Sequence, residues 1–246
     1  MPTSRSPAPA RDGGTDDESR GGVHVEVLTA VFQVRDLDPA GTPGLCVLLE
    51  KATPEDDVWS LPGGTVVAEE TLETTAERLV ERELGVAEVA HLEQLAVFSA
   101  PDRVPRTRTI ASTYLALVRV GESGPPLGVA RWHSVDTLPP LAYDHVEVVS
   151  AARHRLAAKL SYTNIAFALA PDRFPMSQLS EIYGAALGYP VDTTNLLRIL
   201  SRRGVVTATG TVGKTGRTGG RPPALYAFAD TGLRVTDEFA TLRPPM

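Results

Sequence analysis

Two groups of basic residues in this 246-residue chain are suited to binding phosphate groups. Arg103, Arg106 and Arg108 lie close together in the segment PDRVPRTR, and six Lys and Arg residues lie between 195 and 221 with no acidic residue among them. The planar guanidinium of arginine matches the geometry of phosphate oxygens, so these residues are candidates for nucleotide or nucleic-acid contacts. A solvated loop or a solvated basic face would carry the same residues, and this alternative stays open for both groups.

Charge is distributed unevenly along the chain. The net formal charge is -6, from 24 basic and 30 acidic residues, which on its own argues against nucleic acid as a partner. Residues 161–246, however, contain nine basic and six acidic residues, a net charge of +3, whereas residues 1–160 carry the acidic excess. This asymmetry predicts that the second part of the chain contacts nucleic acid.

A third feature is the segment 64–86, in which Gly, Glu and Arg stand at particular spacings. It resembles the Nudix box, the pattern G-x5-E-x7-R-E-U-x-E-E-x-G-U in which U is an aliphatic residue, and the LPGG just before it fits as well. The matching positions are Gly64, Glu70, Arg78, Val80, Glu83, Gly85 and Val86. The resemblance implies an α/β Nudix-like sandwich. The alternative is an ordinary amphipathic surface helix, whose apolar stripe would be Leu72, Ala76, Leu79 and Val80.

Two departures from the pattern bear on the activity that the resemblance implies. The family has Glu where this chain has Leu79 and Arg82, and its carboxylates at i, i+3 and i+4 of one helical face bind Mg²⁺. A single carboxylate, Glu83, beside a guanidinium makes a weak metal site. We therefore predict no catalytic residues, no metal site and no pyrophosphate hydrolysis. The alternative is an ADP-ribose pyrophosphatase with an unusual box, in which Glu70, Glu83 and another acid hold the metal.

Hydrophobic patterning predicts the elements that hold these residues. Residues 1–22 are rich in Pro, Gly, Ser and Asp, which is typical of a disordered tail. Strands are predicted at 23–34, 44–49, 92–98 and 109–120, and helices at 72–84 and 144–160. Together they predict a Nudix-like nucleotide-sensing domain over residues 23–160.

The pattern changes after Tyr162, and we predict a second domain over residues 161–246. Helices at 164–169, 177–187 and 193–203 precede strands at 205–209 and 224–228, which flank a Gly-rich basic loop. This order indicates a C-terminal winged helix-turn-helix domain, whose last helix enters the DNA major groove. Tyr226 and Phe228 are expected to pack the wing onto the helices. The residues assigned to DNA contact are Thr193, Thr194, Asn195, Arg198, Arg202 and Arg203 on the helix and Lys214, Arg217 and Arg221 on the wing.

Beyond the box, the resemblance narrows to one family. The segments 91–118 and 141–174 and the closing GGRPPALYAF are similar to the NrtR family, Nudix-related transcriptional regulators of NAD metabolism. This resemblance implies a homodimeric repressor that binds a palindromic operator, requires no cofactor, and takes ADP-ribose or a related nucleotide as effector. We assign the effector pocket to Trp59, Glu70, Arg78, Arg82, Glu83, Phe98, Arg103 and Arg106. Filling of the core is an equally good account of Trp59.

Composition excludes several other classes of protein. The single cysteine, Cys46, leaves no intramolecular disulfide and suits a reducing compartment. No apolar run approaches the ~18 residues of a membrane span, and the N-terminus lacks the apolar core of a signal peptide. We therefore expect a cytoplasmic protein with no membrane partner. A nucleotide-binding protein whose second domain docks another protein is a third hypothesis, and the lack of acids between 195 and 221 counts against it.

Overall fold

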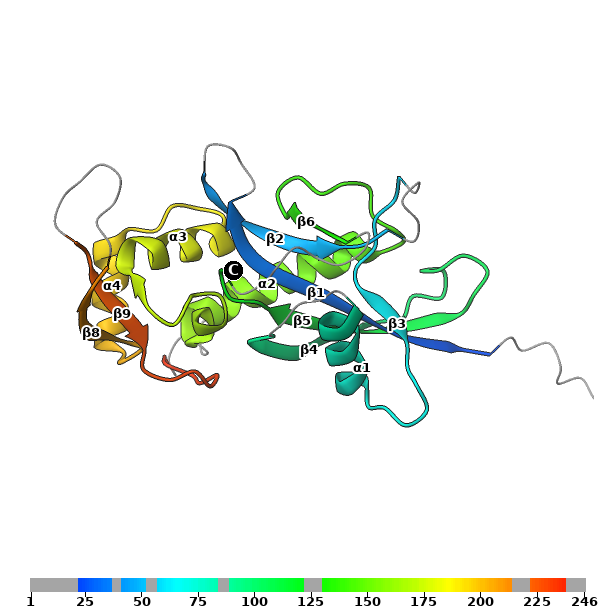
Figure 1. The fold of residues 1–246 in the computed structure, drawn as a ribbon. Coiled ribbons are helices and arrows are strands. Elements are labelled where there is room, and N and C mark those ends of the chain that lie inside the picture. Colours follow the sequence, from blue (N-terminus) through cyan, green and yellow to red (C-terminus); the bar gives the residue numbers. More distant parts are fainter. Residues whose placement is uncertain are drawn as a thin grey trace, which may run out of the picture.

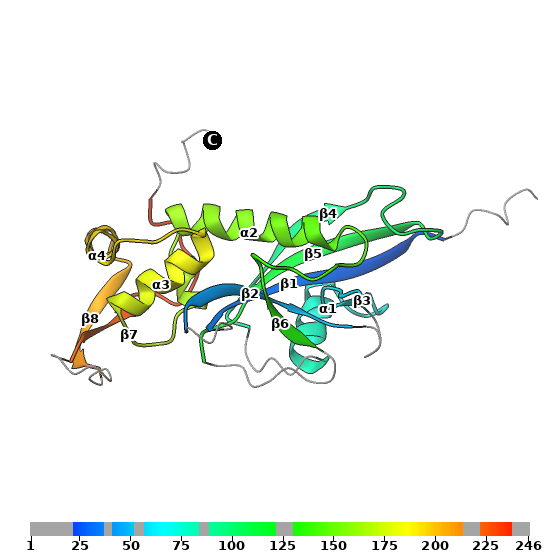
Figure 2. The ribbon, with the colours of Figure 1, turned by 90° about the horizontal axis from the view of Figure 1, so that it is seen from above.

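A computed structural model describes residues 22–36, 41–51, 57–83, 89–121, 130–213 and 222–237, and for Arg82 and Glu83 the backbone alone. A large sheet with helices on both faces is followed by a smaller helical part with its own sheet (Figures 1 and 2). Residues 1–21 and the wing tip at 214–221 lie outside the described residues, so the predicted tail and the roles of Lys214, Arg217 and Arg221 stay predictions.

The large sheet has the strand order β4-β5-β1-β2-β6, and β3 pairs with β1. β1 runs parallel to β5 and antiparallel to β2 and β3. The predicted strands are confirmed, whereas β3 and β6 were missed because three or four residues carry too little alternation to reveal a strand. The strands are β1 (His24–Asp36), β2 (Pro43–Leu49), β3 (Gly63–Thr65), β4 (His91–Phe98), β5 (Thr109–Leu117) and β6 (Arg131–Ser134).

β1 lies at the centre of the sheet because its side chains are apolar on both faces. Phe32 and Val34 pack into the core formed with α2 (His145–Tyr162), whereas Val27 packs with Ala76 of α1 (Leu72–Arg78). Side chains alternate between the two faces of a strand, so the two helices cover opposite faces. Figure 2 shows α2 above the sheet and α1 below it.

The helix predicted over 72–84 is regular only as far as Arg78. The backbone of Leu79–Glu83 (η1) winds as a π-helix, and residue 84 lies outside the described residues. The i, i+3, i+4 spacing of a regular helix therefore does not describe the last part of the box.

The smaller part is built on two adjacent helices and a three-stranded sheet of order β7-β9-β8. The predicted helix at 164–169 is a single 3-10 turn, η2 (Ile165–Ala168), which corrects that prediction. The other elements are β7 (Phe174–Pro175), α3 (Met176–Leu187), α4 (Thr193–Arg202), β8 (Val206–Val212) and β9 (Ala224–Phe228). Phe228 lies 5.3 Å from Phe174 between ring centroids, and both Phe228 and Tyr226 pack against the core, as predicted for the wing.

Local signals set the ends of the two helices. α3 stops at Gly188, whose φ of 80° lies in the left-handed region that favours glycine. α4 starts at Asp192, whose carboxylate accepts a hydrogen bond of 2.7 Å from the Asn195 amide. The turn between α3 and α4 is therefore fixed at both ends.

One hydrophobic core runs from the large sheet into the helical part. It includes Leu156 and Leu160 of α2, Leu179 of α3 and Leu200 of α4, all buried. α2 thus reaches from one part to the other, and the predicted domain boundary near residue 160 falls in its last turn. Among the described helices, none is both long and apolar enough to span a bilayer.

Candidate functional site

Glu70 and Arg78, two residues of the box, bind each other. The Arg78 Nε and Nη2 atoms lie 2.7 and 2.8 Å from the two carboxylate oxygens of Glu70, and Thr75 Oγ1 donates to the same carboxylate at 3.0 Å. Such two-pronged, charge-assisted contacts are strong. This pair ties the loop before α1 to the end of the helix, which gives both residues a positioning role.

Leu79 stands where the Nudix pattern has a carboxylate, and it is buried. Only 4% of its surface is exposed, in a cluster with Val27, Ala76 and Tyr114. A Cβ placed on Gly64 would lie 3.1 Å from a Leu79 methyl, so a larger residue at position 64 would require Leu79 to shift by a few tenths of an ångström. Among the side chains that the structure describes, no three His, Cys, Asp or Glu residues come together as metal ligands. The side chains of Arg82 and Glu83 are not among them.

Arg103 differs from the expectation of a surface phosphate contact. Its side chain is 1% exposed, and its guanidinium donates to Asp144 at 2.6 and 2.8 Å and to Glu26 at 2.6 Å. Burial alone would lower the pKa of Arg103, but the hydrogen bonds and charges of the two acids raise it, so the cation persists. Arg103 therefore holds three segments together instead of facing a ligand.

The other two arginines of this loop are placed differently. Arg108 donates to the carbonyls of Ser99 and Ala100 at 3.0 and 3.3 Å, which closes the loop. Arg106 is exposed, with a left-handed φ of 66° that is unusual for a residue other than glycine. Of the three, Arg106 stays the candidate for contact with a phosphate.

The two aromatic candidates lie at opposite edges of the large sheet. Trp59 contacts the His133 ring of β6 at 4.3 Å between centroids, and Lys51 Nζ lies 5.1 Å from the Trp59 ring. Phe98 ends β4 at the other edge. Both are half-buried against the core on the α2 face, whereas Glu70 and Arg78 belong to the α1 side. Among the assigned residues whose side chains the structure describes, Trp59 and Phe98 thus lie apart from Glu70 and Arg78.

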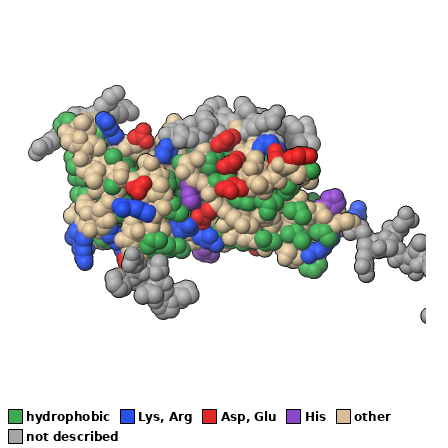
Figure 3. Space-filling view, turned by 90° about the horizontal axis from the view of Figure 1, so that it is seen from below, with side chains coloured by type: hydrophobic (Ala, Val, Ile, Leu, Met, Phe, Trp, Pro, Cys, Tyr) green, Lys and Arg blue, Asp and Glu red, His purple; other side chains and the backbone are tan. Residues whose placement is uncertain are grey.

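The face of α4 that points away from the core carries polar and basic side chains. Thr194, Asn195, Arg198 and Arg202 are exposed, and Arg198 Nη2 donates to Asn195 Oδ1 at 2.7 Å. Leu196 and Leu200 are buried on the opposite face. Figure 3 shows Lys and Arg side chains at the α4 end of the molecule, with a few Asp and Glu among them, and a larger group of Asp and Glu over the Nudix-like part. This helix therefore combines hydrogen-bonding groups with positive charge on one surface.

Two residues assigned to DNA contact are engaged inside the protein. The hydroxyl of Thr193 lies 2.7 Å from that of Ser180 on α3. Arg203 pairs with the Asp237 carboxylate and donates to the carbonyl of Ser161 at 3.0 Å. These two side chains anchor α4 to its neighbours, which the sequence did not reveal, and their contact with DNA stays a prediction. Their partners could not be found from spacing, because Asp237 is 34 residues away.

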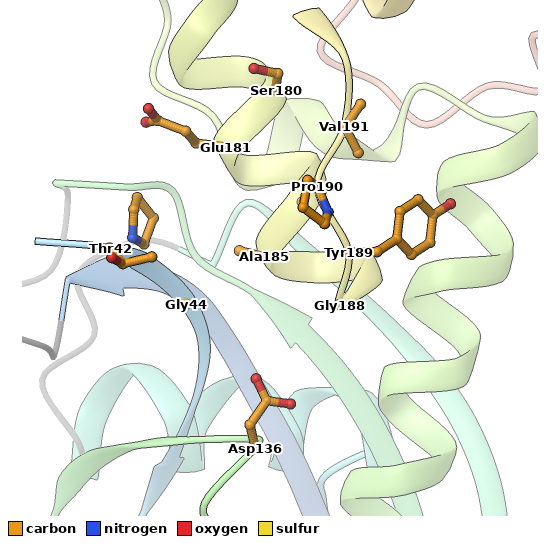
Figure 4. Close-up of a pocket in the computed structure, with 12 residues that line it drawn as sticks. Thr42, Gly44, Asp136, Ser180, Glu181, Ala185, Gly188, Tyr189, Pro190 and Val191 are labelled. Atoms are coloured by element: carbon orange, nitrogen blue, oxygen red, sulfur yellow. The ribbon is translucent and has the colours of Figure 1, made fainter.

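A cavity of about 430 Å³ lies between the start of β2 and α3, beside the turn to α4 (Figure 4). The carboxylates of Asp136 and Glu181 contribute to its walls, together with Gly44, Ala185 and Pro190. Asp136 pairs with Arg153 at 2.9 Å. Negative charge at this place opposes the phosphates of a nucleotide, so we do not assign the effector site to this cavity.

Comparison with known proteins agrees with this arrangement of domains. The NUDIX domain family matches residues 28–152, and the NrtR DNA-binding winged helix domain matches residues 166–228. Fold and sites therefore define a protein in which a Nudix domain is followed by a DNA-binding winged helix domain.

Similarity to individual proteins identifies the family to which the chain belongs. The ADPR responsive transcriptional repressor NtrR of Acinetobacter baylyi is 30% identical over 183 residues, which cover 72% of each chain. The crystal structure of Shewanella oneidensis NrtR complexed with a 27mer DNA is 27% identical with a TM-score of 0.70, covering 83% of this chain and 93% of that one. The ADP-ribose pyrophosphatase of Methanocaldococcus jannaschii is 32% identical over 108 residues, 43% of this chain and 63% of that protein. The chain belongs to the NrtR family of Nudix-related transcriptional regulators.

Proposed function

We propose that this protein is an ADP-ribose-responsive transcriptional repressor that binds operator DNA through its winged helix. The observation that carries the proposal is the exposed face of α4, where Asn195, Arg198 and Arg202 lie together above a buried apolar face. Asparagine suits the edge of adenine in the major groove, and arginine suits guanine or phosphate. The likeness to a DNA-bound NrtR supports this use of the helix.

We propose that the Nudix-like domain binds the effector without hydrolysing it. Leu79 is buried where the pattern has a metal ligand, and Glu70 is held by Arg78. The name of the Acinetobacter relative supports ADP-ribose as the effector. Trp59, Phe98, Arg82, Glu83 and Arg106 stay candidates for contact with it.

In the proposed mechanism the effector shifts a population of conformations. A homodimer places two α4 helices about one or two turns of DNA apart, which predicts a palindromic operator. ADP-ribose releases DNA if it binds more tightly to the arrangement that no longer matches the two half-sites, with a coupling of ~1–3 kcal/mol. The regulated genes would be those of NAD metabolism, and the site of action the cytoplasm.

A paired binding and hydrolysis experiment separates the regulator from a pyrophosphatase. Isothermal titration calorimetry should detect ADP-ribose binding in EDTA, and incubation with Mg²⁺ should release no AMP. Rapid Mg²⁺-dependent formation of AMP and ribose 5-phosphate would establish the enzyme instead. Because a hydrolase needs the metal and a sensor does not, the two hypotheses predict opposite results.

A further inference from the structure

The segment 230–237, which follows the wing, crosses the junction between α2 and α4. Val235 forms an antiparallel bridge with Thr163, and the amides of Thr236 and Asp237 donate to the carbonyl of Tyr162 at 2.7 and 3.2 Å. Arg234 Nη2 donates to the carbonyl of Gly204, just after α4, at 2.9 Å. We call residues 230–237 the strap. It joins the end of α2 to the end of the DNA-facing helix.

Asn164 is the centre of the strap contacts. It is 1% exposed, and its side-chain amide donates to the carbonyls of Asp230 and Gly232 at 3.2 and 2.8 Å. Its Oδ1 accepts from the Arg234 amide at 2.7 Å, and its own amide donates to the Arg234 carbonyl at 3.2 Å. Four hydrogen bonds to one buried residue fix the path of the strap, since a buried polar group left unpaired is costly.

The strap also reaches the side chains of α4. Asp237 pairs with Arg203, and the two are only 17% and 26% exposed. A hollow of about 430 Å³ between α4 and the strap is lined by Arg198, Arg202 and Arg203 on one side and Thr236 and Asp237 on the other. Asp237 is thus the carboxylate of the strap that faces the basic helix.

We propose that the strap holds α4 at a fixed orientation on α2, and that Asn164 and Asp237 are positioning residues for operator recognition. The inference rests on the proposed function, because it takes α4 as the helix that reads DNA. α2 also packs on the sheet of the Nudix-like part, so this junction lies on the physical route between effector and DNA. Losing the strap contacts should leave α4 folded but free to tilt, which costs specific binding more than non-specific binding.

Electrostatics alone predicts that loss of the Asp237 charge raises operator affinity, whereas a positioning role predicts that it lowers operator affinity. Asp237→Asn removes one negative charge near three arginines, and a more positive surface binds DNA more tightly at low salt. If Asp237 acts only as a charge, operator and non-specific DNA should both bind more tightly. If it positions α4, operator affinity should fall about tenfold while non-specific affinity is unchanged or rises.

The control variant is Asp172→Asn, which removes the same charge from an exposed residue outside the strap. Asn164→Asp is the second variant, since it keeps the Oδ1 acceptor for the Arg234 amide and removes the amide donors. ADP-ribose affinity, measured by calorimetry, should stay within about twofold of the wild type in all three. Amide hydrogen exchange in α4 should be faster in Asp237→Asn than in Asp172→Asn, and this measurement needs no DNA.

These measurements distinguish failure of the strap's positioning role from failure of the proposed repressor function. Wild-type protein that binds no operator overturns the proposed function, while faster exchange of α4 in Asp237→Asn would still support the strap. The positioning role of the strap is overturned if amide hydrogen exchange in α4 is unchanged in Asp237→Asn. It is also overturned if this variant binds both operator and non-specific DNA more tightly than the wild type. Loss of ADP-ribose affinity in Asp237→Asn would also overturn the proposal, because the proposal confines the effect of this substitution to the orientation of α4.

Discussion

Arg103 and Asp144 form a two-pronged ion pair that joins the β4–β5 loop to the residue preceding α2, with contacts of 2.6 and 2.8 Å. Glu26 of β1 accepts a third hydrogen bond from the same guanidinium. Two residues with left-handed backbone, Arg106 at φ 66° and Tyr143 at φ 49°, lie in the two connected segments. Strained backbone of this kind persists only where surrounding contacts hold it. Arg103 therefore fixes the start of the helix that reaches the DNA-binding part.

Arg103→Met should destabilise the protein strongly. The change leaves two acids beside a guanidinium-sized gap, and breaking a buried pair typically costs about 3–5 kcal/mol. Urea denaturation followed by circular dichroism measures the free energy of unfolding. Arg106→Met, at the exposed position three residues on, is the matched control and should change stability by less than about 1 kcal/mol. Equal stability of the two variants would contradict the role of Arg103.

Arg198 and Arg202 should each contribute to DNA affinity through phosphate or base contacts. Replacing either by Ala should weaken operator binding. If the arginine contacts a phosphate, the slope of the logarithm of the binding constant against the logarithm of the salt concentration should become shallower by about 0.9. Fluorescence anisotropy between low and moderate salt measures both quantities. Glu181→Ala, on the neighbouring helix α3, serves as a control. Wild-type affinity and slope in both arginine variants would show that α4 does not face DNA.

The helix α4 could be located from the sequence, but the partners of its side chains could not. Its position was predicted within one residue, because Leu196 and Leu200 mark the buried side and Asp192 and Gly204 mark the ends. Its side-chain partners were not predictable. Thr193 and Arg203 are engaged by Ser180 and Asp237, contacts that exist only once α3 and the strap have folded against α4.

The Nudix-like part shows the same limit. Alternating apolar residues located the long strands, and the box located α1, but no local pattern distinguishes a buried arginine from an exposed one. Arg103 and Arg106 stand in the same short basic segment, yet one is buried between two acids and the other is exposed. Asp144 and Glu26, 41 and 77 residues away, make that difference.

Glu93 should make stability depend on pH in the acid range. Burial alone would raise its pKa, but hydrogen bonds from His91 and Lys159 and the Lys159 charge lower it from 4.5 to about 2. A lowered carboxyl pKa stabilises the fold above the unfolded value, and the contribution is lost as the pH falls from about 4.5 to about 2. At 1.36 kcal/mol per pKa unit, the loss is on the order of 3 kcal/mol.

Lys159→Met tests the part of this contribution that comes from Lys159, whose Nζ lies 2.6 Å from the Glu93 carboxylate. Denaturation curves collected from neutral pH downwards should show a smaller decline in stability for this variant than for the wild type. Glu147→Gln, exposed on the same helix, should follow the wild-type curve. If the free energy of unfolding falls equally with pH in Lys159→Met and the wild type, Lys159 does not lower the pKa of Glu93.

Restoring the missing carboxylate at position 79 should not produce a hydrolase. Leu79→Glu places a charge in a cluster with Val27 and Tyr114, and a Leu lost from such a site costs about 2–5 kcal/mol before the charge is counted. The thermal unfolding midpoint of Leu79→Glu should be much lower than that of Val67→Glu, in which the substituted position is exposed. AMP release from ADP-ribose with Mg²⁺ should stay at the level of the blank. A stable, active Leu79→Glu variant would show that this position can still hold metal.

We expect this chain to bind operator DNA and to release it when a nucleotide binds. The most direct measurement is fluorescence anisotropy of a labelled fragment from upstream of the organism's NAD-biosynthesis genes, titrated first with protein and then with ADP-ribose. We expect tight, salt-sensitive binding to this fragment, weaker binding to a scrambled fragment, and release by ADP-ribose in the absence of Mg²⁺. Equal binding to both fragments, or operator binding that ADP-ribose leaves unchanged, would contradict this expectation.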